Sequence, residues 1–180
     1  MTTLTVYRET DLPRPHLETT DGEEIAQALR GLDVRFERWP VARSLDAEAG
    51  QDAILAAYGE EVARLNREGG YQAADVVRLK KGTPDTAPMR AKFLAEHTHA
   101  EDEVRFFVEG AGAFYMRGKA DIFRVVCTAG DLISVPANQR HWFDMGPDPE
   151  FCAIRLFTNP EGWVANFTGD DIASRVPLYE

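Results

Sequence analysis

The sequence has few cysteines, fewer basic than acidic residues, and no long apolar run. Its two cysteines, Cys127 and Cys152, are too few for a disulfide framework, so we expect buried, unpaired thiols. Twenty Lys and Arg face thirty Asp and Glu, and the formal charge of -10 disfavours nucleic acid and anionic lipid as partners. Residues 1–15 lack a signal-peptide pattern, and no stretch is as long as a membrane-spanning helix. We therefore predict a cytoplasmic protein that binds no membrane.

The length of 180 residues, with 44% hydrophobic and 28% charged residues, is typical of one globular domain. We predict a single domain over 1–180, in which residues 1–74 form an α+β scaffold and about 75–160 form the core. In the first part, Pro13 and Pro15 predict a turn after a first strand. The remaining segments are a strand over 3–8, a helix beginning at 21–24, a strand over 34–39, a helix over 46–67, a strand over 75–79 and a short helix over 89–94.

From Val104 onward, short apolar segments alternate with turn signals such as Gly118 and Gly130. This regular spacing of short apolar segments and turn signals is typical of an antiparallel sandwich or a small barrel. The fold class predicted is therefore mainly β with helices. The expected strands cover 104–110, 113–117, 122–127, 132–136, 140–145 and 151–157.

The segment from His97 to Glu103 gathers two imidazoles and several carboxylates. On an extended strand, alternate side chains point the same way, so His97, His99 and Glu103 would share one face and form a metal site. Glu101 has the same parity and is the local rival of Glu103. His141 follows a predicted turn and is the best distant ligand, whereas His16 stands far from either segment and is interpreted as a surface residue.

Alternation also aims Arg105 at the face of Glu103, where a guanidinium could stabilise an oxyanion. The alternative is a plain salt bridge from Arg105 to Glu101 or Asp102, and the pattern alone does not choose between them. The apolar side chains of matching parity would line the wall of a pocket for a small anion with a hydrophobic tail; they are Phe107, Phe143 and Met145.

Two blocks carry a resemblance to the cupin superfamily. They are His97-x-His99-x(3)-Glu103-x(6)-Gly110 and Gly130-x(5)-Pro136-x-Asn138-x(2)-His141. In cupins, the matching histidines and glutamate bind one metal inside a double-sheet jelly-roll barrel. This sequence departs from the pattern at Asn138, where a glycine is usual, and at Met145, where an asparagine is usual. Asparagine tolerates the left-handed backbone, so the turn at Asn138 is expected to survive.

The wider sequence resembles the acireductone dioxygenase family of bacterial methionine salvage. The segments that carry the likeness are 92–117, 130–146 and 154–167, and the likeness runs from the first strand to Trp163. It implies a cupin double-stranded β-helix with the N-terminal elements packed on it. It also implies one Fe(II) or Ni(II) per chain, held by His97, His99, Glu103 and His141, and a methylthio-substituted acireductone and O₂ as substrates.

The resemblance also assigns roles around the metal. Arg105 matches an arginine that helps to form the substrate dianion, Glu96 and Asp102 match acids beside the ligands, and Arg155 and Trp163 match pocket residues. With iron, the family yields formate and the 2-keto acid precursor of methionine. With nickel, it yields carbon monoxide, formate and methylthiopropionate.

We expect a monomeric enzyme of this family. The alternatives are another cupin enzyme, such as an isomerase or a different dioxygenase, and a cupin module that binds a small ligand through a metal without catalysis.

Overall fold

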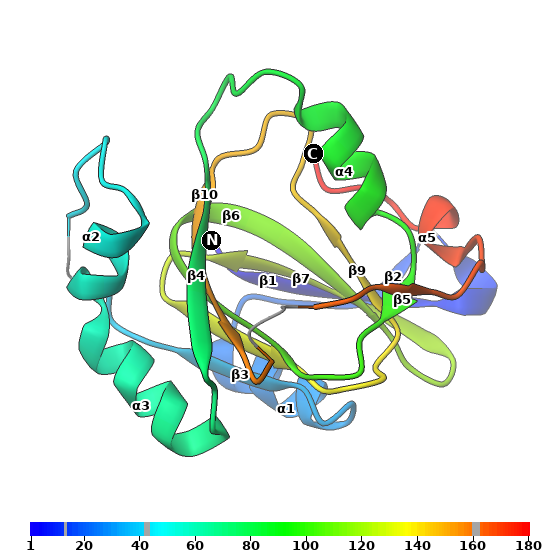
Figure 1. Cartoon of the computed structure of the whole chain (residues 1–180). Coiled ribbons are helices and arrows are strands. Elements are labelled where there is room, and N and C mark those ends of the chain that lie inside the picture. Colours follow the sequence, from blue (N-terminus) through cyan, green and yellow to red (C-terminus); the bar gives the residue numbers. More distant parts are fainter. Residues whose placement is uncertain (13, 42–43, 160–162) are drawn as a thin grey trace.

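The computed structural model describes residues 1–12, 14–41, 44–159 and 163–180 (Figure 1). Its first elements are β1 (Thr3–Arg8), the short 3-10 helix η1 (Glu9–Asp11), β2 (Pro15–Thr19), α1 (Gly22–Arg30), β3 (Arg35–Arg38), α2 (Gln51–Ala57), α3 (Gly59–Gly69), β4 (Ala73–Leu79) and α4 (Thr86–Phe93). The later ones are β5 (His97–Thr98), β6 (Glu103–Arg117), β7 (Asp121–Thr128), β8 (Asp131–Val135), β9 (His141–Asp144), β10 (Phe151–Phe157), β11 (Asn166–Phe167) and α5 (Ile172–Arg175).

The long strand β6 belongs to both sheets of an antiparallel barrel. Its first half pairs with β8 and β10, and these strands extend to β3 and β4. Its second half pairs with β7 and β9 within the order β11-β5-β9-β6-β7-β1-β2. The N-terminal strands β1, β2 and β3 thus add to sheets built by the second half of the chain. The predicted antiparallel architecture is confirmed, although the two strands expected over 104–117 are one.

Gly110 is the point at which β6 passes from one sheet to the other. Its φ of +64° lies in the left-handed region, which glycine enters without the steric cost of a side chain. A Cβ at this position would lie 1.8 Å from the carbonyl oxygen of Glu150, in the loop before β10. The close approach of two backbones therefore requires glycine here.

Gly110→Ala is expected to lower the free energy of unfolding by at least about 3 kcal/mol, because backbone strain and a backbone clash add together. Gly70→Ala is the matched control: Gly70 has a φ of +67°, but a Cβ there meets nothing within 4 Å. The control should lose only about 1 kcal/mol. Urea unfolding followed by circular dichroism compares the two, and equal losses would contradict a special role for the close approach.

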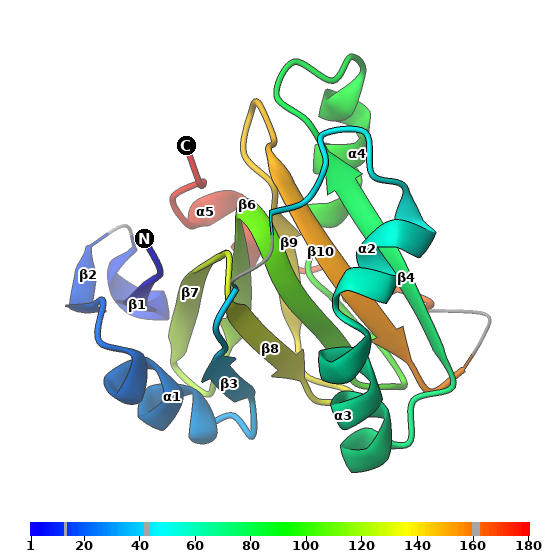
Figure 2. The ribbon, with the colours of Figure 1, turned by 90° about the vertical axis from the view of Figure 1, so that its left-hand side faces the viewer.

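The helices lie outside the barrel, with α2 and α3 along β4 and α1 beside β3 (Figure 2). Asp21 caps α1 by accepting hydrogen bonds from the backbone N–H groups of Glu23 and Glu24, as the acidic start of the segment predicts. The single helix predicted over 46–67 is wrong. It is divided at Tyr58, whose backbone (φ -111°, ψ 26°) leaves the helical region, and Gly59, a poor helix former, begins α3.

Four short elements were not predicted from the sequence: η1, β2, β11 and α5. Pro15 begins β2, an edge strand in which a proline costs no ladder hydrogen bond on the open side. The turn predicted at Pro13 and Pro15 is therefore wrong at Pro15, and Pro13 lies outside the described residues. The other three elements, η1, β11 and α5, contain three, two and four residues, which is too short for any periodicity to show.

Both cysteines are buried and free, as predicted. His16 is exposed on β2, 3.2 Å from Asp121, and so lies on the surface as expected. Among the described residues, no helix has the length and apolar character needed to cross a membrane.

Candidate metal centre

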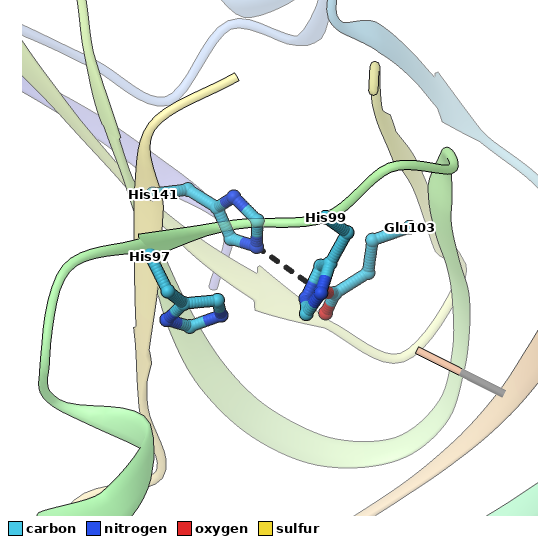
Figure 3. Close-up of side chains that lie close together, drawn as sticks. All are labelled: His97, His99, Glu103 and His141. Carbon is cyan, nitrogen blue, oxygen red and sulfur yellow. Dashed lines mark hydrogen bonds and ion pairs between the residues drawn. The ribbon is translucent and has the colours of Figure 1, made fainter. Parts of the chain in front are cut away.

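Three histidines and one glutamate converge on a single point inside the barrel. One ligand atom from each of His97, His99, Glu103 and His141 lies within 4.8 Å of the others, and all four residues are buried. Figure 3 shows the three rings and the carboxylate turned toward one another. The sequence predicted His97, His99 and Glu103 on one face with His141 as a distant partner, and the structure brings the four together.

Backbone pairing explains the convergence. His97 on β5 lies directly opposite His141 on β9, so two residues far apart in the sequence become neighbours. The turn before β9 reaches back to the ligand segment, because the Asn138 N–H donates to the carbonyl oxygen of His99 at 2.8 Å. Asn138 has a φ of +63°, so the predicted left-handed turn is confirmed.

The outer nitrogen of each ring is fixed by a backbone carbonyl. The Nδ1 atoms of His97, His99 and His141 lie 2.7–2.8 Å from the carbonyl oxygens of Ala95, Val164 and Gln139. Because a carbonyl oxygen only accepts, each Nδ1 carries the proton, and each neutral ring presents an Nε2 lone pair. Outer-shell bonds of this kind orient the histidines of metal sites.

The inner nitrogens of the His99 and His141 rings point at one carboxylate oxygen of Glu103. Burial alone would lower the pKa of His99, but its contact with Glu103 raises it. Oε2 of Glu103 lies 2.9 Å from Nε2 of His99 and 3.1 Å from Nε2 of His141. At these distances a proton on Nε2, or a metal ion in its place, must lie between each ring and the carboxylate. The donor set of three imidazoles and one carboxylate therefore fits a divalent transition metal.

Arg105 completes the charge balance around Glu103. Its Nη2 forms an ion pair with Oε1 of Glu103 at 2.8 Å, and Nε of Arg105 has no hydrogen-bond partner within the described ranges. The guanidinium sits 4.5 Å from the Phe143 ring and 5.7 Å from the Trp163 ring. The sequence-based alternative of a salt bridge to Glu101 or Asp102 is wrong, because both of those acids bond elsewhere.

Burial governs the protonation states of the site. It lowers the pKa of His97 to about 4, which leaves that ring neutral near pH 7. For Glu103, burial alone would raise the pKa, but Arg105 and the rings of His141 and His99 hold it well below its usual value. Neutral imidazoles and an ionised carboxylate are the forms that bind a metal.

A cavity of about 490 Å³ opens in front of the four residues. Of the predicted pocket residues, Phe143, Arg155 and Trp163 line it together with Arg105. Trp163 is held in place by donating from Nε1 to the carbonyl oxygen of Asp102.

Phe107 does not line this cavity, and that part of the prediction is corrected. It shares the interior face of Arg105 but lies deeper, where the barrel is filled by aromatic packing against Phe114, Phe143 and Phe151. Met145 is likewise buried in the core and lies outside the lining of the cavity.

The other acids of the segment bond to neighbouring segments of the chain and do not line the cavity. Glu96 accepts a hydrogen bond from Thr168 Oγ1 at 2.7 Å, and Glu101 accepts from Thr158 Oγ1 at 2.6 Å. Asp102 accepts from the backbone N–H of Ala137, in the turn that leads to His141. Glu101 shares the parity of Glu103 but is turned outward, because residues 99–102 do not continue the strand.

Sequence reasoning missed several residues of the cavity wall. Phe157 follows Arg155 by two positions on β10, so strand alternation could have found it. The others come from segments that only the fold brings to the site; they are Asp75, Lys92, Phe93, Ala165 and Phe167.

With this geometry established, comparisons with known proteins identify the family. The model of the ARD/ARD' family matches residues 3–165. The chain belongs to this family. An acireductone dioxygenase from Parvibaculum lavamentivorans is 60% identical over 180 residues, covering 100% of this chain and 98% of that protein. Another, from Pseudomonas aeruginosa, is 55% identical and covers 100% of this chain and 99% of that protein.

A solved acireductone dioxygenase from Bacillus anthracis, with a cadmium ion in its active centre, has the same fold. It superposes with a TM-score of 0.79 at 33% identity, covering 93% of this chain and 98% of that chain. The recognised family and the predicted fold class are thereby confirmed, and the chain is an enzyme of the acireductone dioxygenase family. Together, that cadmium-bound structure and the cluster of three histidines and one glutamate support a metal at this centre.

Proposed function

We propose that the chain cleaves 1,2-dihydroxy-3-keto-5-methylthiopentene with O₂ in methionine salvage. The observation that carries the proposal is the acceptor cluster of three histidines and Glu103 beside the buried Arg105, at the inner end of an aromatic cavity. The proposed products are formate and 2-keto-4-methylthiobutyrate with iron, or methylthiopropionate, formate and carbon monoxide with nickel.

We propose His97, His99, Glu103 and His141 as the ligands of one Fe(II) or Ni(II) ion. When bound, such an ion supplies Lewis-acid character and a template that orients the substrate. Nickel has the higher intrinsic affinity for nitrogen and oxygen ligands, but metal supply in the cell can override that preference. Elemental analysis of protein purified without added metal tests the assignment, and the measured ion should match the products.

The protein's own side chains would bind the two ends of the substrate differently. Arg105 is only 5% exposed, so solvent screens its charge weakly and the charge acts strongly on an anionic oxygen nearby. It would favour the doubly deprotonated substrate and hold its oxygen-bearing end. The rings of Phe143, Phe157 and Trp163 would surround the methylthio tail and exclude water.

Oxygen consumption tests the activity directly. When metal-loaded protein is mixed with the acireductone without O₂, the absorbance of the substrate should persist. After admission of air, that absorbance should fall rapidly. A control without protein corrects for spontaneous oxidation. Ligand binding without oxygen uptake would instead support a cupin module that only binds the substrate.

We also propose a single-domain monomer that works in the cytoplasm. The two free, buried thiols are compatible with a reducing compartment. Light scattering coupled to size exclusion should give the mass of one chain, and a dimer mass would contradict the proposal.

A further inference from the structure

Three charged residues form a row across neighbouring strands of the cavity wall. In the register of the sheet, Arg155 on β10 lies directly opposite Arg105 on β6 and, on its other side, opposite Asp75 on β4. All three side chains line the cavity. The row therefore extends outward from Glu103 and its neighbour Arg105 to a second guanidinium and a second carboxylate.

Two arginines opposite each other on one sheet face repel, which costs stability unless each has a counter-charge. Arg105 has Glu103, and Arg155 has Asp75. Both arginines are thus kept in the cavity wall by acids at the two ends of the row.

Asp75 and Arg155 form a bidentate ion pair. Nε of Arg155 donates to Oδ1 of Asp75 at 2.7 Å, and Nη2 donates to Oδ2. The Arg155 guanidinium also lies 5.3 Å from the Phe157 ring and 5.4 Å from the Trp163 ring. These contacts fix the plane of the guanidinium and leave Nη1 outside the ion pair.

The charge of the cavity wall indicates which class of ligand Nη1 of Arg155 would contact. The cavity is lined by three basic side chains, Lys92, Arg105 and Arg155, against two acidic ones, although the whole chain carries a formal charge of -10. Glu103 is in addition the proposed ligand of a divalent ion. The site is therefore locally positive and suits an anion whose oxygens stand on adjacent carbons.

We propose that Asp75 is a positioning residue that aims Nη1 of Arg155 at the oxygen-bearing end of the substrate, as a second donor beside Arg105. This inference rests on the proposed function. Asp75 itself does not touch the substrate. Its role is to prevent Arg155 from sampling other rotamers, so that less conformational entropy is lost when the substrate binds.

The ion pair of Asp75 and Arg155 is not expected to be needed for folding. The side chains of Asp75 and Arg155 are 35% and 25% exposed, and ion pairs of this kind add little to stability. Variants at either position should therefore fold, and their effects can be measured as substrate affinity.

The test is a double-mutant cycle on metal-loaded protein with the variants Asp75→Asn, Arg155→Met and both together. The acireductone is titrated without O₂, so that its dissociation constant is measured without turnover. We expect each single variant to weaken binding roughly tenfold, and the double variant to be no weaker than Arg155→Met, because the two residues act as one unit. In air, KM should rise by a similar factor while kcat changes less than about threefold.

The matched control is Glu48→Gln, which breaks the exposed pair of Glu48 and Lys80, outside the cavity, and should leave the dissociation constant unchanged. Binding by Asp75→Asn within twofold of wild type would overturn the inference, as would additive effects in the double variant. If the wild-type protein binds no acireductone without O₂, the proposed function itself fails, and the two failures are thus distinguishable.

Discussion

Replacing His141 by alanine is expected to abolish turnover and to weaken divalent metal binding by well over the roughly 10- to 100-fold that loss of an outer-shell partner costs. His141 supplies one of the four converging atoms, and its Nδ1 is already fixed by the Gln139 carbonyl, so no other atom is poised to replace Nε2. Elemental analysis after dialysis, together with competition against a chelator, measures the loss.

A second measurement follows from linkage. A metal that binds only the folded protein stabilises it in proportion to the logarithm of its concentration above Kd. Wild-type protein should therefore show a rise in Tm on addition of Fe(II) or Ni(II), and His141→Ala should show little or none. Tm values of the metal-free forms show whether the substitution has disturbed the fold.

Glu101→Ala and His16→Ala are the matched controls. Glu101 is the acid of equal parity that the sequence could not separate from Glu103, and His16 is the histidine on the surface. Both variants should retain the metal. Unchanged metal affinity in His141→Ala, or loss of metal in Glu101→Ala, would contradict the four-ligand assignment.

Most of the cluster proposed as the metal site could be predicted from the sequence because three of its residues are local and periodic. His97, His99 and Glu103 are close along the chain and of equal parity. His141 was predicted as the best distant ligand because it follows a predicted turn, and the cupin resemblance implied the same position. The pairing of β5 with β9 makes it a neighbour of His97. The turn at Asn138 was predictable for the same reason, because one residue determines its backbone.

Two features could not be predicted in this way: how deep a side chain lies in the barrel, and which residue it meets on the neighbouring strand. Parity places Phe107 on the face of Arg105, yet it does not show that the barrel is filled with rings at that level. Asp75 is 80 residues from Arg155, and its role depends on the register between β4 and β10. The break at Tyr58 was hidden because the apolar stripe continues through both helices.

Arg105→Met is expected to keep the metal and to lower kcat/KM by about 10²- to 10³-fold, the usual effect of removing one donor from a developing oxyanion. Methionine preserves the length and apolar contacts of the side chain, so the rings of Phe143 and Trp163 stay packed. Arg105→Lys is the matched variant, since it retains the charge without the planar fork, and it should fall between methionine and wild type.

The same substitution separates the proposed catalytic role of Arg105 from its ion pair with Glu103. Without metal, Arg105→Met leaves the ionised Glu103 buried with no counter-charge, which should cost about 3–5 kcal/mol of stability. A bound divalent ion supplies that counter-charge, so the loss should shrink when metal is added. Urea unfolding with and without metal measures the difference. If the variant instead loses its metal, Arg105 acts by holding Glu103 in place, and low turnover would then report an empty site instead of a missing donor.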